Sequence, residues 1–137
     1  MHLNRRHLLS NVAVVAASLT IGTAWAAQPV VEIIAFAHPP VQSALKPLRD
    51  WLASQGSKVR VIEIDMESPQ AEKRVAAVGV KGHVPILVLV NGKYKYTRAD
   101  GSPMEFVNFP AGPGAPAGFK GAWSAEDVQL VLKAQKP

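Results

Sequence analysis

The segment "KGHVPILVLVNGKYKY", residues 81–96, decides the fold that this sequence predicts. Pro85 enters a run of Ile, Leu and Val at 86–90, which is typical of a buried β-strand. An Asn-Gly dipeptide follows at 91–92, and it is among the strongest hairpin signals because both residues tolerate a positive φ. We therefore expect a strand at 86–90, a tight turn, and an antiparallel strand returning over 93–98.

Outward from this segment, short apolar runs alternate with amphipathic stretches of helical spacing. Ser68 and Pro69 suit the N-cap and first turn of a helix, and Ser124 with Asp127 resembles a capping box. The predicted elements are a strand at 29–37, a helix at 39–55, a strand at 58–65, a helix at 68–78, the two hairpin strands, a further strand at 104–109 and a terminal helix at 124–136.

This order predicts an α/β fold with a mixed sheet. The first β-α-β unit should be right-handed, so that its two strands are parallel neighbours. The hairpin must then add antiparallel on the other side of the first strand, and helices must cover both faces of the sheet.

The stretch "IDMESPQAEKRVAAVGVKGHVPILVLVNGKY", residues 64–94, resembles the thioredoxin-like family. Phe36 in the first strand and Pro47 in the following helix also suit that family. The resemblance implies a β-α-β-α-β-β-α three-layer sandwich with a mixed sheet. It covers residues 30–98 and resumes in the last helix, so the Gly/Pro-rich segment 99–123 is an irregular insertion.

The resemblance implies a cis bond between Val84 and Pro85, although a trans proline is also permitted at the start of a strand. The family's paired cysteines would fall near Pro39 and Gln42, counting back from Pro47, but the chain contains no cysteine. Because exchange requires a thiolate, thiol–disulfide oxidoreductase activity is excluded.

Residues 1–26 have the layout of a secretory signal: a basic start, an apolar stretch and a small-x-small triplet ending at Ala26. Arg5-Arg6 resembles a twin-arginine signal, and an ordinary basic start remains open because Asn4 replaces the usual Ser or Thr. We expect cleavage after Ala26, one domain over 27–137, a periplasmic or secreted location, and no membrane insertion after cleavage.

The predicted topology places a set of residues on one rim, where the first two strands end and the third begins. Open α/β sheets commonly bind ligands at this edge. We therefore predict that the rim binds a protein or peptide, which could pair with exposed backbone beside Pro85. The rim residues are His38, Pro39, Pro40, Gln42, His83, Val84 and Pro85.

A metal site is the alternative, since residues 27–137 contain only His38 and His83 as histidines and both fall on the rim. With Asp65 or Glu67 as third ligand the set would suit zinc, whereas the Met66 thioether would favour copper. Polar residues at strand ends, with His38 capping the helix, are the simpler interpretation. An enzyme of unknown reaction is a further alternative, and the sequence assigns no catalytic residue.

Charge and aromatic residues complete the sequence predictions. Of the 15 basic residues, two lie in the leader, so the domain has a net charge of about +3, scattered without aromatic interleaving. Nucleic-acid binding is therefore not expected. In the insertion, Phe109, Phe119 and Trp123 either anchor it on the core or contact a partner. The oligomeric state is not predicted.

Overall fold

A computed structural model of the chain describes residues 27–112 and 115–135, so the predicted signal sequence lies outside the described residues. The elements are β1 (Val30–Ala35), α1 (Pro39–Gln55), a 3-10 turn (Gly56–Lys58), β2 (Arg60–Asp65), α2 (Pro69–Ala77), β3 (Ile86–Val90), β4 (Lys95–Thr97), β5 (Pro103–Glu105) and α3 (Ala125–Ala134). Within the described ranges, no helix combines the length and the apolar character that crossing a membrane requires.

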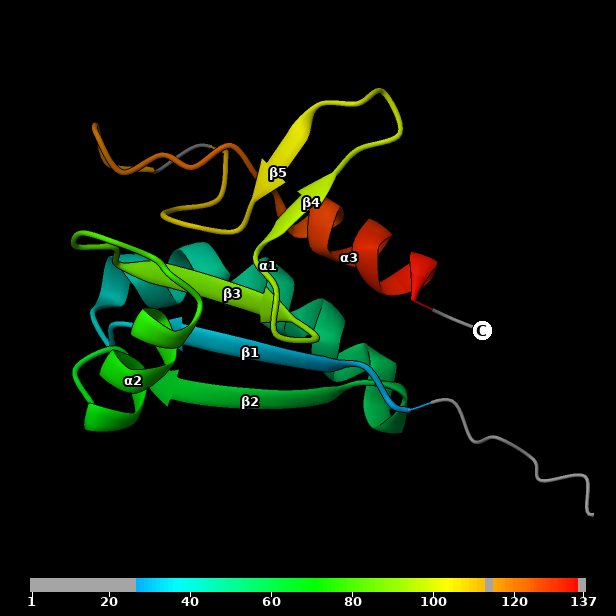
Figure 1. Cartoon of the computed structure of the whole chain (residues 1–137), viewed down its shortest axis with the longest axis horizontal. Helices are drawn as coiled ribbons and strands as arrows, with labels where there is room; N and C mark the ends of the chain where they lie inside the picture. Colours follow the sequence, from blue (N-terminus) through cyan, green and yellow to red (C-terminus); the bar gives the residue numbers. More distant parts are fainter. Residues whose placement is uncertain (1–26, 113–114, 136–137) are drawn as a thin grey trace, which may run out of the picture.

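The central sheet has the strand order β2-β1-β3 (Figure 1). β1 is parallel to β2, with Val31 beside Val61, and antiparallel to β3, with Ile33 beside Val88. The predicted β-α-β unit with an antiparallel third strand is therefore confirmed. The fold is a mixed α/β fold with a three-stranded mixed sheet and three helices.

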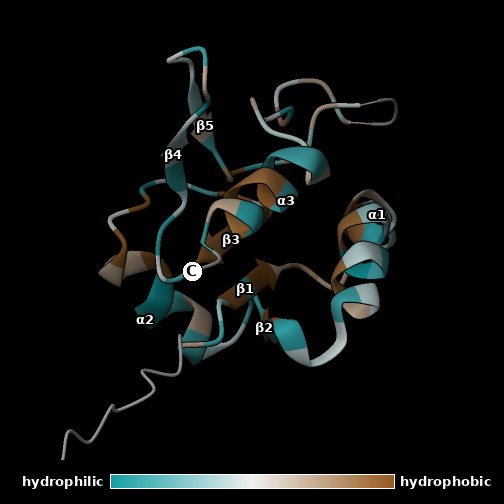
Figure 2. Ribbon diagram, turned by 90° about the vertical axis from the view of Figure 1, so that its right-hand side faces the viewer, coloured by the Kyte–Doolittle hydropathy of each residue, from teal (hydrophilic) through white to brown (hydrophobic). Residues whose placement is uncertain are grey.

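Helices cover both faces of the sheet, as predicted, and each face has its own apolar cluster. Figure 2 shows α2 and α1 on opposite sides of β1 and β3. On one face, alternate residues of β1 and β3 pack against α1 and α3; on the other, Ile34, Leu87 and Leu89 pack against Ile64 and Ala71. This alternation explains why β3 is apolar throughout: every one of its residues is buried.

The returning hairpin strand was predicted beside β3, and this prediction is wrong beyond the first residue. The turn forms, with φ of 48° at Asn91 and 80° at Gly92, and Lys93 N donates to Val90 O at 3.1 Å. After Lys93 the chain leaves the sheet. β4 pairs instead with β5 in a separate two-stranded sheet (Figure 1).

Residues 106–108 take the place beside β3. Val88 N donates to Phe106 O at 2.9 Å, and Asn108 N donates to Ile86 O at 2.9 Å. The physical reason is burial: Phe106 is fully buried there, whereas the residues of β4 are polar or only partly buried. The predicted strand at 104–109 thus forms in part, as β5 and this edge segment.

Besides Phe106, the insertion is anchored on the core through two of the three aromatic residues that the sequence analysis singled out. Phe109 and Trp123 are buried, and Trp123 Nε1 donates to the carbonyl oxygens of Val107 at 3.1 Å and Asn108 at 3.2 Å. Phe119 remains 41% exposed. The anchoring interpretation is therefore confirmed for Phe109 and Trp123 and wrong for Phe119.

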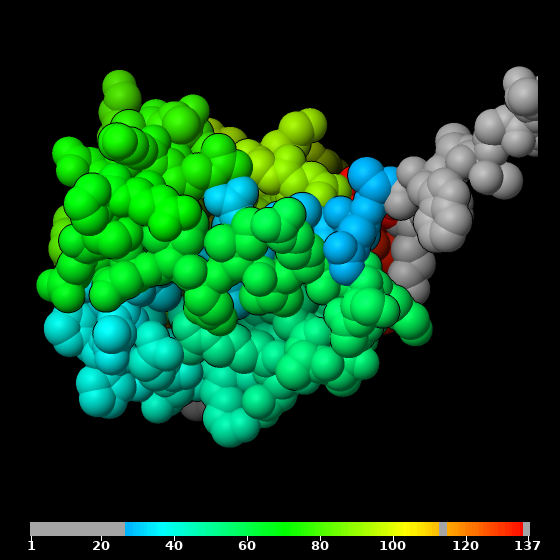
Figure 3. Space-filling view, turned by 90° about the horizontal axis from the view of Figure 1, so that it is seen from below, coloured from blue at the N-terminus to red at the C-terminus, as the bar shows by residue number. Residues whose placement is uncertain are grey.

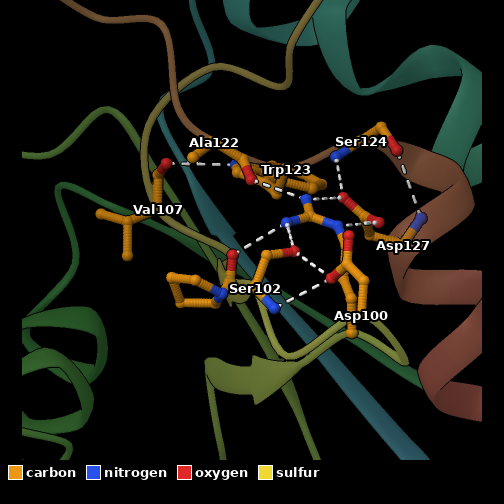
Figure 4. A network of polar contacts seen from close by, with 9 residues as sticks. Asp100, Ser102, Val107, Ala122, Trp123, Ser124 and Asp127 are labelled. Carbon is orange, nitrogen blue, oxygen red and sulfur yellow. Dashed lines mark hydrogen bonds and ion pairs between the residues drawn. The ribbon is translucent and has the colours of Figure 1, made fainter.

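The contacts of Arg98 tie the β4–β5 hairpin to the start of α3. Figure 4 shows Ser102, Ser124 and Asp127 of this network. Arg98 Nε and Nη2 donate to both Asp127 oxygens at 3.1 and 2.8 Å, and Nη1 donates to Pro103 O at 2.8 Å. Asp127 also completes the predicted capping box with Ser124. The cluster fixes the irregular segment without a disulfide.

Candidate functional site

The loop before β3 lies against the end of β1, as the predicted rim requires. Phe36 N donates to Pro85 O at 3.2 Å, and Gln42 Nε2 in α1 donates to Phe36 O at 2.8 Å. Figure 3 shows the start of α1 (cyan) beside the 66–84 region (green) at one end of the molecule. The structure therefore brings together the end of β1, the first turn of α1 and the loop that leads into β3.

Phe36 is the centre of this rim, and the sequence indicated it only as a strand residue. Its ring centroid lies 5.4 Å from that of His38 and 5.3 Å from that of His83, distances typical of aromatic contacts. Both histidines are exposed. His38 is the N-cap residue of α1 by position, but its side chain makes no capping hydrogen bond, so that interpretation is wrong.

Gln42 is held in place by a chain of polar contacts. Arg49 Nη1 donates to Gln42 Oε1 at 2.7 Å, while Arg49 Nε and Nη2 donate to the Glu63 carboxylate at 2.8 and 2.9 Å. Asp65 serves the turn after β2, where its Oδ1 accepts from Glu67 N at 3.0 Å. The acidic residues of β2 are thus engaged with separate partners and do not form a carboxylate pair.

The bond between Val84 and Pro85 is trans, as are all peptide bonds of the described residues, so the cis prediction is wrong. Trans is the lower-energy form of an X-Pro bond unless the surrounding structure fixes cis. Pro85 is buried just before β3, a position where a strand needs no donor from proline. Its carbonyl still joins the sheet by accepting from Phe36 N.

Residues 81–84 have free main-chain groups. Among the described residues, none donates a hydrogen bond to this segment or accepts one from it, whereas Val80 N before it and Pro85 O after it are both bonded. Lys81, Gly82 and His83 are exposed. A short stretch of polar backbone is therefore open at the rim.

A groove of about 360 Å³ adjoins this free backbone on the α2 face of the sheet. Its polar side chains are Glu72 and His83, and its walls are otherwise apolar. Sequence reasoning placed Met66 at the rim only as a possible copper ligand and missed the contribution of α2, although the apolar residues Val75 and Val78 indicated a packed helix face. The lining residues are Phe36, Met66, Glu72, Val75, Ala76, Val80, Gly82, His83 and Val84.

The predicted metal ligands do not form a coordination group in this structure. Within residues 27–112 and 115–135, no cluster of three or more His, Asp or Glu side chains could hold a metal ion. His38 and His83 both contact Phe36, and Asp65 is engaged in the turn after β2. Zinc or copper binding therefore stays a prediction from the sequence alone.

Comparison with known proteins found no similar protein. No family model matches the chain, and neither a curated protein nor a solved structure matches it. The class that fold and site define is therefore a mixed α/β domain without cysteine, with an apolar groove and free backbone at one end of its sheet.

Proposed function

We propose that this protein is an exported, non-redox domain of thioredoxin-like type that binds an extended protein or peptide segment at the rim. The order β-α-β-α-β, with α1 and α3 on one face of the sheet and α2 on the other, supports the family assignment. The absence of cysteine supports a non-redox role, and the layout of residues 1–26 supports export.

The observation that carries the proposal is the free main chain of residues 81–84 beside the groove. A peptide in extended conformation can bond to such backbone, while alternate side chains enter a neighbouring pocket. Hydrogen bonds to the backbone give affinity for peptides of many sequences, whereas the groove selects which side chain of the peptide can enter. The two features lie together here, since Gly82, His83 and Val84 belong to both.

The groove favours an apolar side chain on the bound segment. Phe36, Val75 and Val80 offer aliphatic and aromatic contacts, whose burial stabilises a complex by about 25 cal/mol per Å² of apolar surface removed from water. Glu72 is the acidic side chain that lines the same groove. We therefore expect bound peptides to carry a large aliphatic residue with a basic residue nearby.

The test is a selection of displayed random peptides on the purified protein, followed by affinity measurement with a selected synthetic peptide. Ala76→Trp should fill the groove and weaken binding at least tenfold. Ala77→Trp is the matched control: it adds the same bulk at the next exposed position of α2, which lines a different hollow. Circular dichroism should show both variants folded.

Two outcomes contradict the proposal. The first is a selection that enriches no peptide consensus. The second is a peptide that binds Ala76→Trp and Ala77→Trp equally well, because the groove would then play no part in binding.

A further inference from the structure

A second groove, of about 400 Å³, lies at the opposite end of the sheet from the rim. It is built where β1 and β2 begin and where α1 and α3 end. Pro29 precedes β1 and Val59 precedes β2, whereas the rim begins at Phe36, after the last residue of β1. Its lining residues are Ala27, Gln28, Pro29, Trp51, Gln55, Ser57, Lys58, Val59, Leu132, Lys133 and Gln135.

The floor of this groove is apolar. Val59 and Leu132 are buried members of the core, and the indole of Trp51 packs against the same cluster while staying partly exposed. Most of the exposed wall belongs to apolar atoms. A volume of this size falls within the range of pockets that take small organic ligands.

The mouth of the groove is positively charged. Lys58 and Lys133 are its charged side chains, both are exposed, and no acidic residue lines it. Neither lysine joins an ion pair with a described residue. If the leader is removed after Ala26, the α-amino group of Ala27 adds a further cation there, because such groups have a pKa near 8.

We propose that this groove binds a small amphiphile with a carboxylate head and an apolar tail, such as a free medium-chain fatty acid. The carboxylate lies between Lys58 and Lys133, and the tail covers Trp51 and Leu132. Charge complementarity selects an anion, and apolar contact supplies most of the affinity. This site is independent of the peptide-binding rim.

The experiment is a fluorescence titration of the exported protein with decanoate, after its N-terminus has been checked by mass spectrometry. Residues 27–137 contain two tryptophans, of which Trp123 is buried in the core, so Trp51 reports on the groove. Decanol tests the tail without the charge. Decyltrimethylammonium tests the opposite charge.

We expect saturable binding of decanoate and weaker binding of both other probes. The double variant Lys58→Gln/Lys133→Gln should bind decanoate about fivefold more weakly, since each exposed ion pair contributes little. Its affinity for decanol should not change. The control Lys93→Gln/Lys120→Gln removes the same charge from exposed positions outside this groove and should bind like the unaltered protein.

Three results would overturn the proposal. The first is that decanoate gives no saturable change in fluorescence, because the groove would then not bind it. Equal affinity for decanoate and decanol would mean that the lysines only offset the C-terminal ends of α1 and α3. An equal loss of affinity in both double variants would mean that overall charge, rather than this groove, attracts the anion.

Discussion

Gly121 occupies the tightest point of the insertion, and replacing it with alanine should destabilise the whole domain. An added Cβ would lie closer to Val107 O than any ordinary contact allows, 2.8 Å from Trp123 Cδ1 and 3.0 Å from Phe109 O. Two of these obstacles are main-chain oxygens, and the third belongs to a buried indole. None of them can move without displacing the segment that covers β3.

The expected loss follows from the cost of overpacking, which is typically about 1–3 kcal/mol. Because the clash meets rigid backbone, we expect a value near the upper end, about 3 kcal/mol. With a urea dependence of about 1.5 kcal/mol/M, the unfolding midpoint should fall by about 2 M. The slope itself should not change, since the same surface is exposed on unfolding.

Gly118→Ala is the matched control. Gly118 has a φ of 82°, and no atom lies within 4 Å of its added Cβ, so only backbone strain of about 1 kcal/mol is expected. Both variants are measured by urea unfolding followed by fluorescence. The reasoning is refuted if Gly121→Ala is as stable as Gly118→Ala or more stable.

Two further predictions concern helix starts. Burial alone would raise the pKa of Asp127, but hydrogen bonds from Arg98 and from Ser124 N, with the charge of Arg98, bring it below its ordinary value of 3.8. Asp127 therefore stabilises the fold above that pH and loses this effect as the pH falls, so the Tm difference between the unaltered protein and Asp127→Asn should shrink from pH 7 to pH 3; a constant difference would contradict this. Ser68→Ala removes the acceptor of Ala71 N at 3.1 Å and should lower the free energy of unfolding by about 1 kcal/mol in urea titration; an unchanged midpoint would show that the cap contributes nothing.

Short-range signals in the sequence predicted the parts of the fold that local chemistry controls. The apolar run of β3, the Asn-Gly turn and the Ser124 cap all formed where they were expected. Gly56 follows the end of α1 with a positive φ of 55°, as a residue without Cβ permits. These features depend on a few neighbouring residues, so a single sequence reveals them.

Long-range partners were not predictable from such patterns. No local pattern indicates that Arg98 binds Asp127, 29 residues later. The same holds for Arg49 and Glu63, which are 14 residues apart. Two segments, residues 93–98 and 106–108, could have lain beside β3. Residues 106–108 take this position because Phe106 is better buried there. The rim residues were placed correctly by topology, but the groove beside them required the packing of α2.

The segment 106–108 has a consequence for how copies of this protein meet. Because this segment covers the outer side of β3, β2 is the uncovered edge strand of the central sheet within the described residues. This edge strand carries three exposed charged residues, Arg60, Glu63 and Asp65. Pairing of two copies along it would desolvate their charged side chains. Although Val61 on the same strand is 39% exposed, these charges make β2 a poor template for edge-to-edge pairing between two copies.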